Sequence, residues 1–349
     1  MNPRYPIYVI SKGRWATRWT SDALERMGVP YLIVVEPQEE ARYADYVAKN
    51  KILVTPFSNL GLGSIPVRNF IWEHSTALGA KRHWCIDDNI HGFYRLHMNL
   101  KIMCSTGAVF AAAEDFTDRY ENVPISGFQY FMFARRKEKA PAFALNTRVY
   151  SCILIQNDLR LGEDGVGQWR GRYNEDTDLS IRALKAGFCT ILFYAFLCEK
   201  QTTMTMKGGN TDELYAGTNE GAKENDGRWK MAESLRLQHP ELVQITRKWG
   251  RWQHHVDYRP FKRNKLIRRA DAIFPEGSNN YGMILKEFAP EEPRIEAPIY
   301  RAPEIVLPEP QKEDRTSIEY FARMQDELRE RGRLSALAWH KERNLRCSL

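Results

Sequence analysis

Short apolar runs alternate with amphipathic segments along the first ninety residues of the chain. The runs have the length and character of buried strands and lie at 6–11, 31–35, 52–56 and 83–87. The segments between them have apolar residues at helical spacing and lie at 17–28, 37–50 and 67–79. Because strands that alternate with helices pair in parallel, the pattern predicts an α/β fold with a largely parallel sheet and flanking helices.

The rest of the chain is more varied. One helix is predicted at 111–122, and strands are predicted at 125–134 and 149–156. Another helix is expected to begin after Asn174, a good N-cap, and to end at Gly187. Three segments follow: a polar, Gly-rich loop at 204–228, a Pro- and Glu-rich extended strap at 272–314, and a final helix at 315–343.

Two acids and an amide, Asp87, Asp88 and Asn89, follow the run at 83–87 directly. By themselves they favour a solvated turn, because Asp and Asn are common turn residues. The alternative is a divalent cation site, because adjacent carboxylates repel unless a positive charge lies between them. Strand alternation places Asp87 and Asn89 on the same side and turns Asp88 away, toward a ribose or a neighbouring strand. A second acidic pair, Glu175 and Asp176, opens the later helix and favours the metal interpretation.

The net charge of +7 is concentrated in one segment. Residues 247–269 hold nine Lys or Arg and one acid, a net charge of +8, so the rest of the chain is close to neutral. Trp249, Trp252, Tyr258 and Phe261 are interleaved with these charges. Basic and aromatic side chains together suit a phosphate-bearing partner with stackable bases, and a solvated helical face is the alternative.

Composition narrows the class of protein. With 43% hydrophobic and 27% charged residues among 349, the chain is typical of a globular protein. Its six cysteines lack metal-finger spacing, which argues against zinc, and several of them lie in apolar runs as thiols of a reducing compartment do. No apolar stretch reaches about 18 residues, and the N-terminal run is too short for a signal peptide. We therefore expect a cytoplasmic protein without a membrane partner.

These features combine in one arrangement. A Mg²⁺ or Mn²⁺ ion held by the strand-end acids would neutralise a diphosphate, and the cations Lys12, Arg14 and Arg68 would help to position the nucleotide. A carboxylate on the other side would deprotonate an attacking hydroxyl. That is the chemistry of sugar transfer from a nucleotide sugar.

The order of the two acidic motifs resembles that of GT-A glycosyltransferases. In these enzymes an acidic motif ends a strand after the nucleotide-binding half, and an "ED" helix follows in the acceptor half. Here "IDDN" would be the first motif and "NEDTDLSIRALKAGF" the second. The resemblance covers roughly residues 5–200 and implies a GT-A-like fold. Asn89 replaces the last acid of the motif, and its amide can still ligate a metal, although it lowers the ligand charge.

A closer resemblance rests on six motifs in order: "IYVISKGRW", "IPVRNFIWEHS", "CIDDNI", "NEDTDLSIRAL", "KGGNT" and "GRWQHHVDY". Together they are similar to the TET-associated glycosyltransferases encoded by DNA bacteriophages, to about residue 265. The family implies sugar transfer, with a UDP-sugar as the expected donor, to 5-hydroxymethylcytosine or a related hydroxymethylpyrimidine in phage DNA. It also implies the host cytoplasm as the location.

The resemblance suggests a role for each candidate residue. Asp176 is expected to be the catalytic base, with Glu175 as the fallback and Asp178 as a partner of the helix dipole only. The expected ligands of Mn²⁺ or Mg²⁺ are Asp87, Asn89 and His254. The expected donor-binding residues are Lys12, Arg14, Arg68, Asp87 and Asp88. The expected acceptor- and DNA-binding residues are Gly208, Gly209, Asn210, Trp252, His255, Lys262, Arg263 and Lys265.

The chain then divides into three regions. Residues 1–200 are expected to form the GT-A-like nucleotide-sugar and catalytic core, 201–270 a lid loop and basic acceptor-binding segment, and 271–349 the strap and C-terminal helix. Two alternatives stay open: a glycosyltransferase acting on polysaccharide or protein, and a non-catalytic nucleic-acid-binding protein. The segment at 247–269 argues against the first, since a neutral glycan does not require its charge, and the "ED" helix argues against the second.

Overall fold

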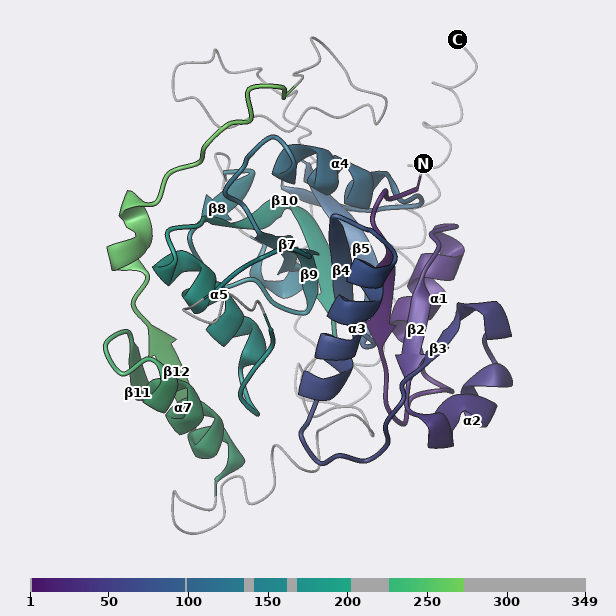
Figure 1. Cartoon of the computed structure of the whole chain (residues 1–349). Helices are drawn as coiled ribbons and strands as arrows, with labels where there is room; N and C mark the ends of the chain where they lie inside the picture. The colour runs from purple at the N-terminus through teal and green to yellow at the C-terminus, as the bar shows by residue number, and fades with distance from the viewer. Residues whose placement is uncertain (1, 98, 135–140, 162–167, 202–225, 273–349) are drawn as a thin grey trace, which may run out of the picture. The chain divides into compact units, whose positions relative to one another are not determined.

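The computed structural model describes residues 2–97, 99–134, 141–161, 168–201 and 226–272, which form a layered α/β fold (Figure 1). The chain divides into two units, Met1–Glu292 and Pro293–Leu349, and the second lies wholly outside the described residues. The predicted strap and final helix also lie outside them, apart from residue 272, and so does the loop at 204–228, apart from residues 226–228.

One ten-stranded sheet forms the middle layer, in the order β3-β2-β1-β4-β9-β7-β10-β5-β6, with β8 paired to β10. Its parallel part consists of β1 (Ile7–Ile10), β2 (Leu32–Val35), β3 (Ile52–Val54) and β4 (Arg82–Asp87). These are the four apolar runs at the start of the sequence. A second parallel pair is formed by β7 (Ile125–Tyr130) and β10 (Thr190–Lys200). The predicted α/β fold is confirmed.

Antiparallel strands complete the sheet. β9 (Cys152–Gln156) lies between β4 and β7 and is antiparallel to both. The sequence pattern does not predict three others: β5 (Ile90–His97), β6 (Leu100–Met103) and β8 (Phe143–Leu145). β5 and β6 carry many half-exposed or exposed residues near the sheet edge, so they lack the apolar run that marks a central strand. β5 and β8 both pair with β10, which ends at the site described below.

Helices cover both faces of the sheet because side chains alternate along each strand. On one face, Ile7 and Trp84 pack with α1 (Trp19–Arg26) and α4 (Ala108–Thr117). On the other, Tyr8 and Cys85 pack with α3 (Ile65–Ala77) and α5 (Glu175–Lys185). Within the described ranges no helix is long and apolar enough to cross a membrane.

The predicted helix at 37–50 is only partly formed. Pro37–Glu39 is a 3-10 turn, α2 is the short helix Glu40–Ala44, and Lys49–Lys51 is a second 3-10 turn. Pro37 fits the first turn, where a backbone N–H has no helical partner. Only Tyr43 of α2 is buried, so little apolar surface supports a longer helix.

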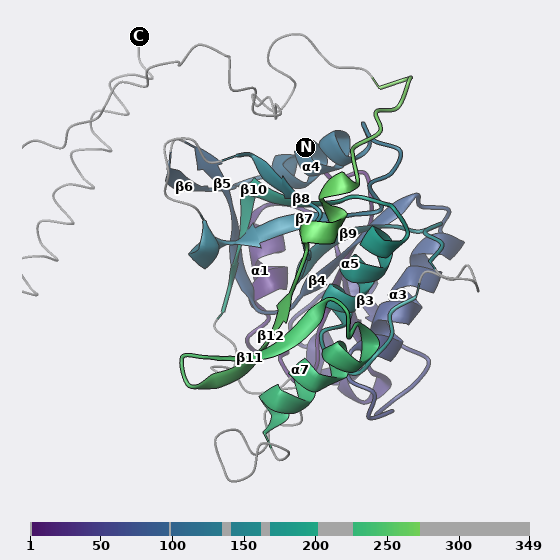
Figure 2. The same ribbon diagram turned by 90° about the vertical axis from the view of Figure 1, so that its left-hand side faces the viewer.

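The C-terminal arm, residues 226–272, consists of α7 (Gly227–Gln238), a hairpin of β11 (Val243–Lys248) and β12 (Arg251–Val256), and a 3-10 helix at Arg259–Arg263. The alternative of a helical face for the basic segment is therefore wrong. Figure 2 shows the hairpin and α7 lying together. A small apolar cluster joins the arm to α5: Ile181 and Leu184 of α5 pack with Leu235, Leu242, Val243, Val256 and Phe261.

Candidate active site

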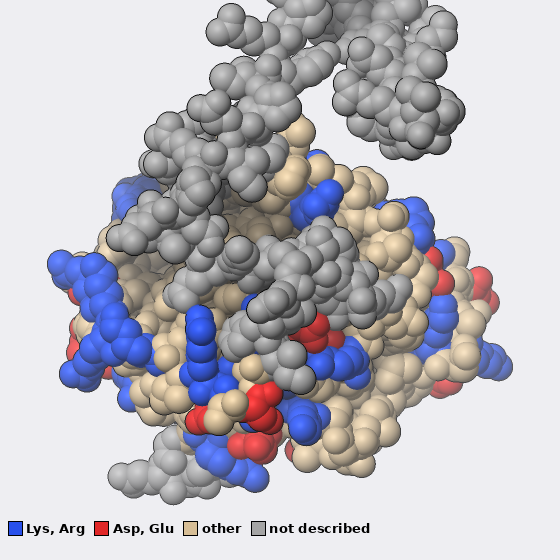
Figure 3. All heavy atoms as spheres, turned by 90° about the horizontal axis from the view of Figure 1, so that it is seen from above, with Lys and Arg blue, Asp and Glu red and all other residues tan. Residues whose placement is uncertain are grey.

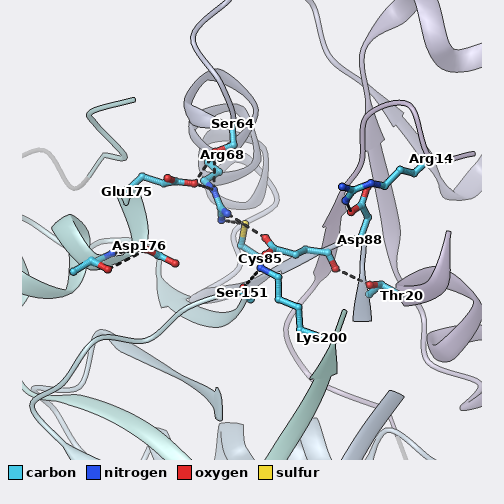
Figure 4. A network of polar contacts seen from close by, with 12 residues as sticks. Arg14, Thr20, Ser64, Arg68, Cys85, Asp88, Ser151, Glu175, Asp176 and Lys200 are labelled. Atoms are coloured by element: carbon cyan, nitrogen blue, oxygen red, sulfur yellow. Dashed lines mark hydrogen bonds and ion pairs between the residues drawn. The ribbon is translucent and has the colours of Figure 1, made fainter. Parts of the chain in front are cut away.

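An ionic network lies at the carboxyl end of β4, where open α/β sheets bind their ligands (Figure 4). Asp87 ends the strand, and its Oδ2 atom accepts a hydrogen bond from Lys200 Nζ at 2.7 Å. Its Oδ1 atom accepts from the guanidinium of Arg68 at 3.3 Å. Burial opposes ionisation of Asp87, but Lys200 and Arg68 outweigh it and lower the pKa to about 2. Asp87 is therefore a fixed negative charge with two fixed cationic partners.

Asp88 has a different set of partners at the end of β1. It accepts a hydrogen bond from Ser11 Oγ at 2.7 Å and forms an ion pair with Arg14. Its side chain is buried, and this burial raises its pKa although Arg14 and Ser11 act in the opposite direction. Asp87 and Asp88 thus face opposite sides, as strand alternation requires. Lys12, the other cation predicted from this part of the sequence, has its Nζ atom 3.4 Å from Oε2 of Glu36, and its side chain is 45% exposed.

Arg68 of α3 connects the end of β4 to the start of α5. Its Nε atom lies 3.1 Å from Oε1 of Glu175, and the same oxygen accepts a bond from Ser64 Oγ at 2.7 Å. Its guanidinium also lies 4.7 Å from the ring centre of Trp169. Arg68 is only 5% exposed, and its charge holds Asp87 and Glu175 in place. The predicted contact of Arg68 with the donor stays a prediction.

Asp176 is the acid of this network that differs most from an ordinary surface carboxylate. Burial raises its pKa to about 6, and the charges of Glu175 and Asp87 act in the same direction, while Arg68 and Arg148 oppose them. Its Oδ1 atom accepts from the Thr177 backbone N–H at 2.7 Å. Among the described residues no salt bridge to Asp176 is formed. A carboxylate with a pKa near neutrality is suited to accept a proton at physiological pH.

Asn174 and Asp178, at the start of α5, do not behave as the sequence predicts. Asn174 is the residue before the helix, but it is left-handed, with φ 55°, and makes no capping bond. Its side chain donates to the Met231 carbonyl at 2.8 Å instead, which ties α5 to α7.

Asp178 is not a simple helix-dipole partner. It is fully buried and lies 2.8 Å from Arg182 Nε, 3.0 Å from Arg170 and 2.8 Å from His239 Nε2. Burial opposes its ionisation, but the bonds from His239 and the two arginines lower its pKa. Asp178 is therefore the centre of a structural ion cluster between α5 and the C-terminal arm.

The predicted metal ligands do not form a metal-binding set. Both oxygens of Asp87 are engaged by cations, and His254 Nε2 lies 3.1 Å from a guanidinium nitrogen of Arg148. Burial and the charge of Arg148 lower the pKa of His254 to about 4. The buried Oδ1 atom of Asn89 has no hydrogen-bond partner among the residues that the structure describes, so this atom alone of the predicted ligands fits. No group of three His, Cys, Asp or Glu that could hold a metal occurs in the described ranges. Metal dependence stays a prediction.

Several predicted acceptor-binding residues surround one open pocket of about 900 Å³. His255, Lys262 and Lys265 of the arm line it together with Asn146 and Tyr258. Arg263 is exposed on the same 3-10 helix, and the ring of Trp252 lies 5.5 Å from the Arg247 guanidinium across the hairpin. The predicted residues Gly208, Gly209 and Asn210 lie outside the described residues. In Figure 3, Lys and Arg side chains gather along the left edge, the side on which Figure 1 places the arm.

Sequence reasoning missed Lys200, Ser151 and Arg148. Lys200 and Ser151 complete the surroundings of Asp87, and Arg148 lies between His254 and the Tyr150 ring. The available signal was weak: Lys200 follows an apolar run, as Asp87 does. Only the pairing of β4 with β9, of β9 with β7 and of β7 with β10 shows that β4 and β10 run in the same direction, so that Asp87 and Lys200 lie at the same edge of the sheet.

Comparisons with known proteins give one family, and similar solved structures are also found. The family model for TET-associated glycosyltransferases matches residues 5–209. No curated protein matches the chain. Among solved structures, the crystal structure of S. aureus TarS 1–349 is similar with a TM-score of 0.36 and 8% sequence identity. That match covers 76% of this chain and 99% of the TarS chain.

Proposed function

Because the chain belongs to the TET-associated glycosyltransferase family and is therefore a glycosyltransferase, we propose that its acceptor is a hydroxymethylpyrimidine in DNA. The sugar would come from a nucleoside-diphosphate sugar, with UDP as the first nucleotide to test, and 5-hydroxymethylcytosine is the first acceptor. The observation that carries the chemistry is Asp176, a half-buried carboxyl with a pKa of about 6 at the edge of the strand-end network.

Each residue of the network has a part in the proposed transfer. The hydroxymethyl oxygen attacks the anomeric carbon and forms the new glycosidic bond, and the bond from that carbon to the diphosphate breaks, so that the nucleoside diphosphate leaves with the electron pair. Asp176 accepts the hydroxyl proton as the attack proceeds. Glu175 is less suited to this task because Arg68 and Ser64 already occupy its Oε1 atom. Arg68 fixes the distance between Asp87 and the start of α5.

The C-terminal arm supports DNA as the acceptor. At its hairpin turn, Trp249 is 86% exposed and has a left-handed backbone, with φ 50°, followed by Gly250 with φ 72°. An aromatic residue in this conformation is unusual and costs free energy, so its exposure favours a functional role. Arg247, Lys248 and Arg251 flank the turn, and more cations follow at 259–269.

A base inside a duplex is out of reach of Asp176 unless it is extruded from the stack. An exposed indole can stack on a displaced base or in the gap that the base leaves, and neighbouring cations can bind the phosphates on either side. The pocket beside His255 and Lys265 offers a further polar surface on the same arm. A neutral glycan acceptor would need neither the exposed indole nor the neighbouring cations.

The test uses hydroxymethylated duplex DNA and a panel of nucleotide sugars, in parallel reactions with Mn²⁺ and with EDTA. Mass spectrometry of the digested nucleosides should show the mass of one hexose or one acetylhexosamine added to the hydroxymethyl nucleoside. The same duplex with cytosine in place of 5-hydroxymethylcytosine is the matched control. Modification of an offered polysaccharide or protein, with hydroxymethylated DNA left unmodified, would refute the proposal.

A further inference from the structure

Lys200 holds a positive charge at the place where the sequence predicts a divalent metal. Its Nζ atom lies 2.7 Å from Oδ2 of Asp87 and 2.7 Å from Oγ of Ser151. It also lies 5.5 Å from the ring centre of Tyr130, and the side chain is 17% exposed. The ammonium is thus enclosed by oxygen atoms and an aromatic face, as a bound cation would be.

The backbone is irregular beside this side chain. β10 pairs with β5 in a register that shifts between Cys198 and Lys200, which is the mark of a β-bulge. Cys198 faces Phe93 and Lys200 faces Ile90, so the extra residue lies on β5. Bulges bend the strand that carries them and are common beside active sites. This one bends β5 at the point where β10 ends, next to Lys200.

The partner of Lys200 is held by a second irregular backbone. Ser151 has φ 62°, a left-handed conformation that a non-glycine residue rarely adopts. Its carbonyl accepts the Asp87 backbone N–H at 2.9 Å, and its hydroxyl lies 2.6 Å from the Tyr130 hydroxyl. Ser151 therefore fixes both Asp87 and Lys200. A strained left-handed residue and a bulge in the neighbouring strand β5 thus lie beside one lysine, which an ordinary surface ion pair would not require.

We infer that Lys200 is the cation that contacts the donor diphosphate, and that donor binding and sugar transfer do not require a divalent metal. This inference rests on the proposed nucleotide-sugar donor. When the bond to the diphosphate breaks, negative charge grows on the leaving phosphate, and a fixed ammonium stabilises it without reorganisation. Asp87 and Ser151 keep the ammonium in place, and the 17% of the side chain that is exposed would be available to an incoming phosphate.

The other two predicted metal ligands, Asn89 and His254, also argue against a divalent ion at this place. Asn89 contributes a single neutral oxygen, and His254 is paired with Arg148. A divalent ion at Asp87 would have to displace Lys200 and would then lie close to the displaced ammonium and to Arg68. That like-charge repulsion disfavours the metal-bound state.

The experiment measures UDP binding by isothermal titration calorimetry to the full chain, in EDTA and in Mn²⁺. Wild type is expected to bind UDP with the same affinity in both buffers. Lys200→Met should weaken binding roughly 10- to 100-fold in EDTA, the usual worth of a hydrogen bond to a charged group. Lys200→Arg keeps the charge and should retain most of the affinity. Lys51→Met, which removes a lysine paired with Glu25 far along the sheet, is the matched control and should bind as wild type does.

The effect of Mn²⁺ on UDP binding by Lys200→Met distinguishes a lysine that takes the place of a metal from a lysine with a purely structural role. If Lys200 stands in place of a metal, Lys200→Met opens Asp87 to a cation, so Mn²⁺ should strengthen UDP binding to the variant while leaving wild type unchanged. UDP binding by wild type only in Mn²⁺, or a Lys200→Met variant that binds as wild type does in EDTA, overturns the inference and leaves the proposed function standing. Failure of wild type to bind UDP, CDP, GDP or ADP in either buffer defeats both the inference and the proposed donor.

Discussion

Arg68 Nε and Glu175 Oε1 lie 3.1 Å apart, although 107 positions separate the two residues in sequence. This ion pair joins the helix after β3 to the helix that carries Asp176. Since Arg68 also bonds Asp87, one buried guanidinium sets the spacing of the acids on both sides of the site. Its charge also acts on Asp176, whose pKa it lowers against the effect of burial.

The first prediction follows from that effect on Asp176. Turnover by wild type should rise with pH, pass an inflection near 6, where Asp176 loses its proton, and then level off. Arg68→Met removes a charge that lowers this pKa, so the inflection should move to higher pH. Arg68→Lys keeps the charge and should leave the inflection near that of wild type. The measurement is a pH profile of kcat for the three proteins. An unmoved inflection in Arg68→Met would show that another group titrates.

The second prediction separates chemistry from binding. Asp176→Asn keeps the size of the side chain but cannot accept a proton at neutral pH. Turnover should fall by roughly two to four orders of magnitude, the usual worth of a general base, while UDP and DNA binding stay close to wild type. Asp22→Asn alters a half-exposed acid in the first turn of α1 and is the matched control. If turnover survives in Asp176→Asn, Glu175 becomes the next candidate.

The third prediction concerns stability. Asp178→Asn leaves three cationic or polar partners without their buried carboxylate, so we expect a loss of about 3–5 kcal/mol in the free energy of unfolding. The folded-state pKa of Asp178 is lowered from 3.8. Its contribution is therefore complete above that value and is lost as the pH falls through the lower folded pKa. Urea denaturation of wild type and variant at neutral and acidic pH measures both effects. A variant as stable as wild type would refute the structural role.

The fourth prediction distinguishes base stacking from phosphate binding in the interaction with DNA. Trp249→Ala should weaken binding by about 1–3 kcal/mol, the worth of one stacked base, with no change in salt dependence. Replacing Arg263, Lys265, Arg268 and Arg269 by Ala should lower the log–log salt slope by about 0.9 for each phosphate that the variant no longer binds. Leu237→Ala removes an exposed apolar side chain from α7 and serves as the control. An unchanged slope in the fourfold variant would place the DNA path elsewhere.

Sequence periodicity was enough to locate the parallel strands β1 to β4, because they are apolar runs with helical segments between them, buried in β1, β2 and β4 and half-buried in β3. It also brought Asp87 and Asp176 into one hypothesis, since both stand at the ends of strong local patterns. Lys200 could not be found this way. Its place beside Asp87 depends on the pairing of strands that lie about a hundred residues apart in sequence, which no local pattern encodes.

The hairpin of the C-terminal arm and the partners of Asp178 also depend on features that local sequence patterns do not reveal. Strand alternation in the hairpin is hidden by charged residues on both faces, and its turn depends on a left-handed Trp249 that sequence statistics disfavour. Arg182 lies one helical turn after Asp178 and could have been paired with it from sequence. His239, the third member of that cluster, lies on the arm and becomes a neighbour only when the arm packs against α5.

α5 is clamped on two opposite sides. Leu179 and Ala183 are embedded in the core under the sheet, while Ile181 and Leu184 are embedded in the core of the arm. A helix packed in this way cannot rotate about its axis, because any rotation would pull buried side chains out of both cores and leave voids. The rotational setting of its first turn is thus fixed by residues that lie three to eight positions after Asp176. The direction in which Asp176 points therefore depends on packing that never touches a substrate.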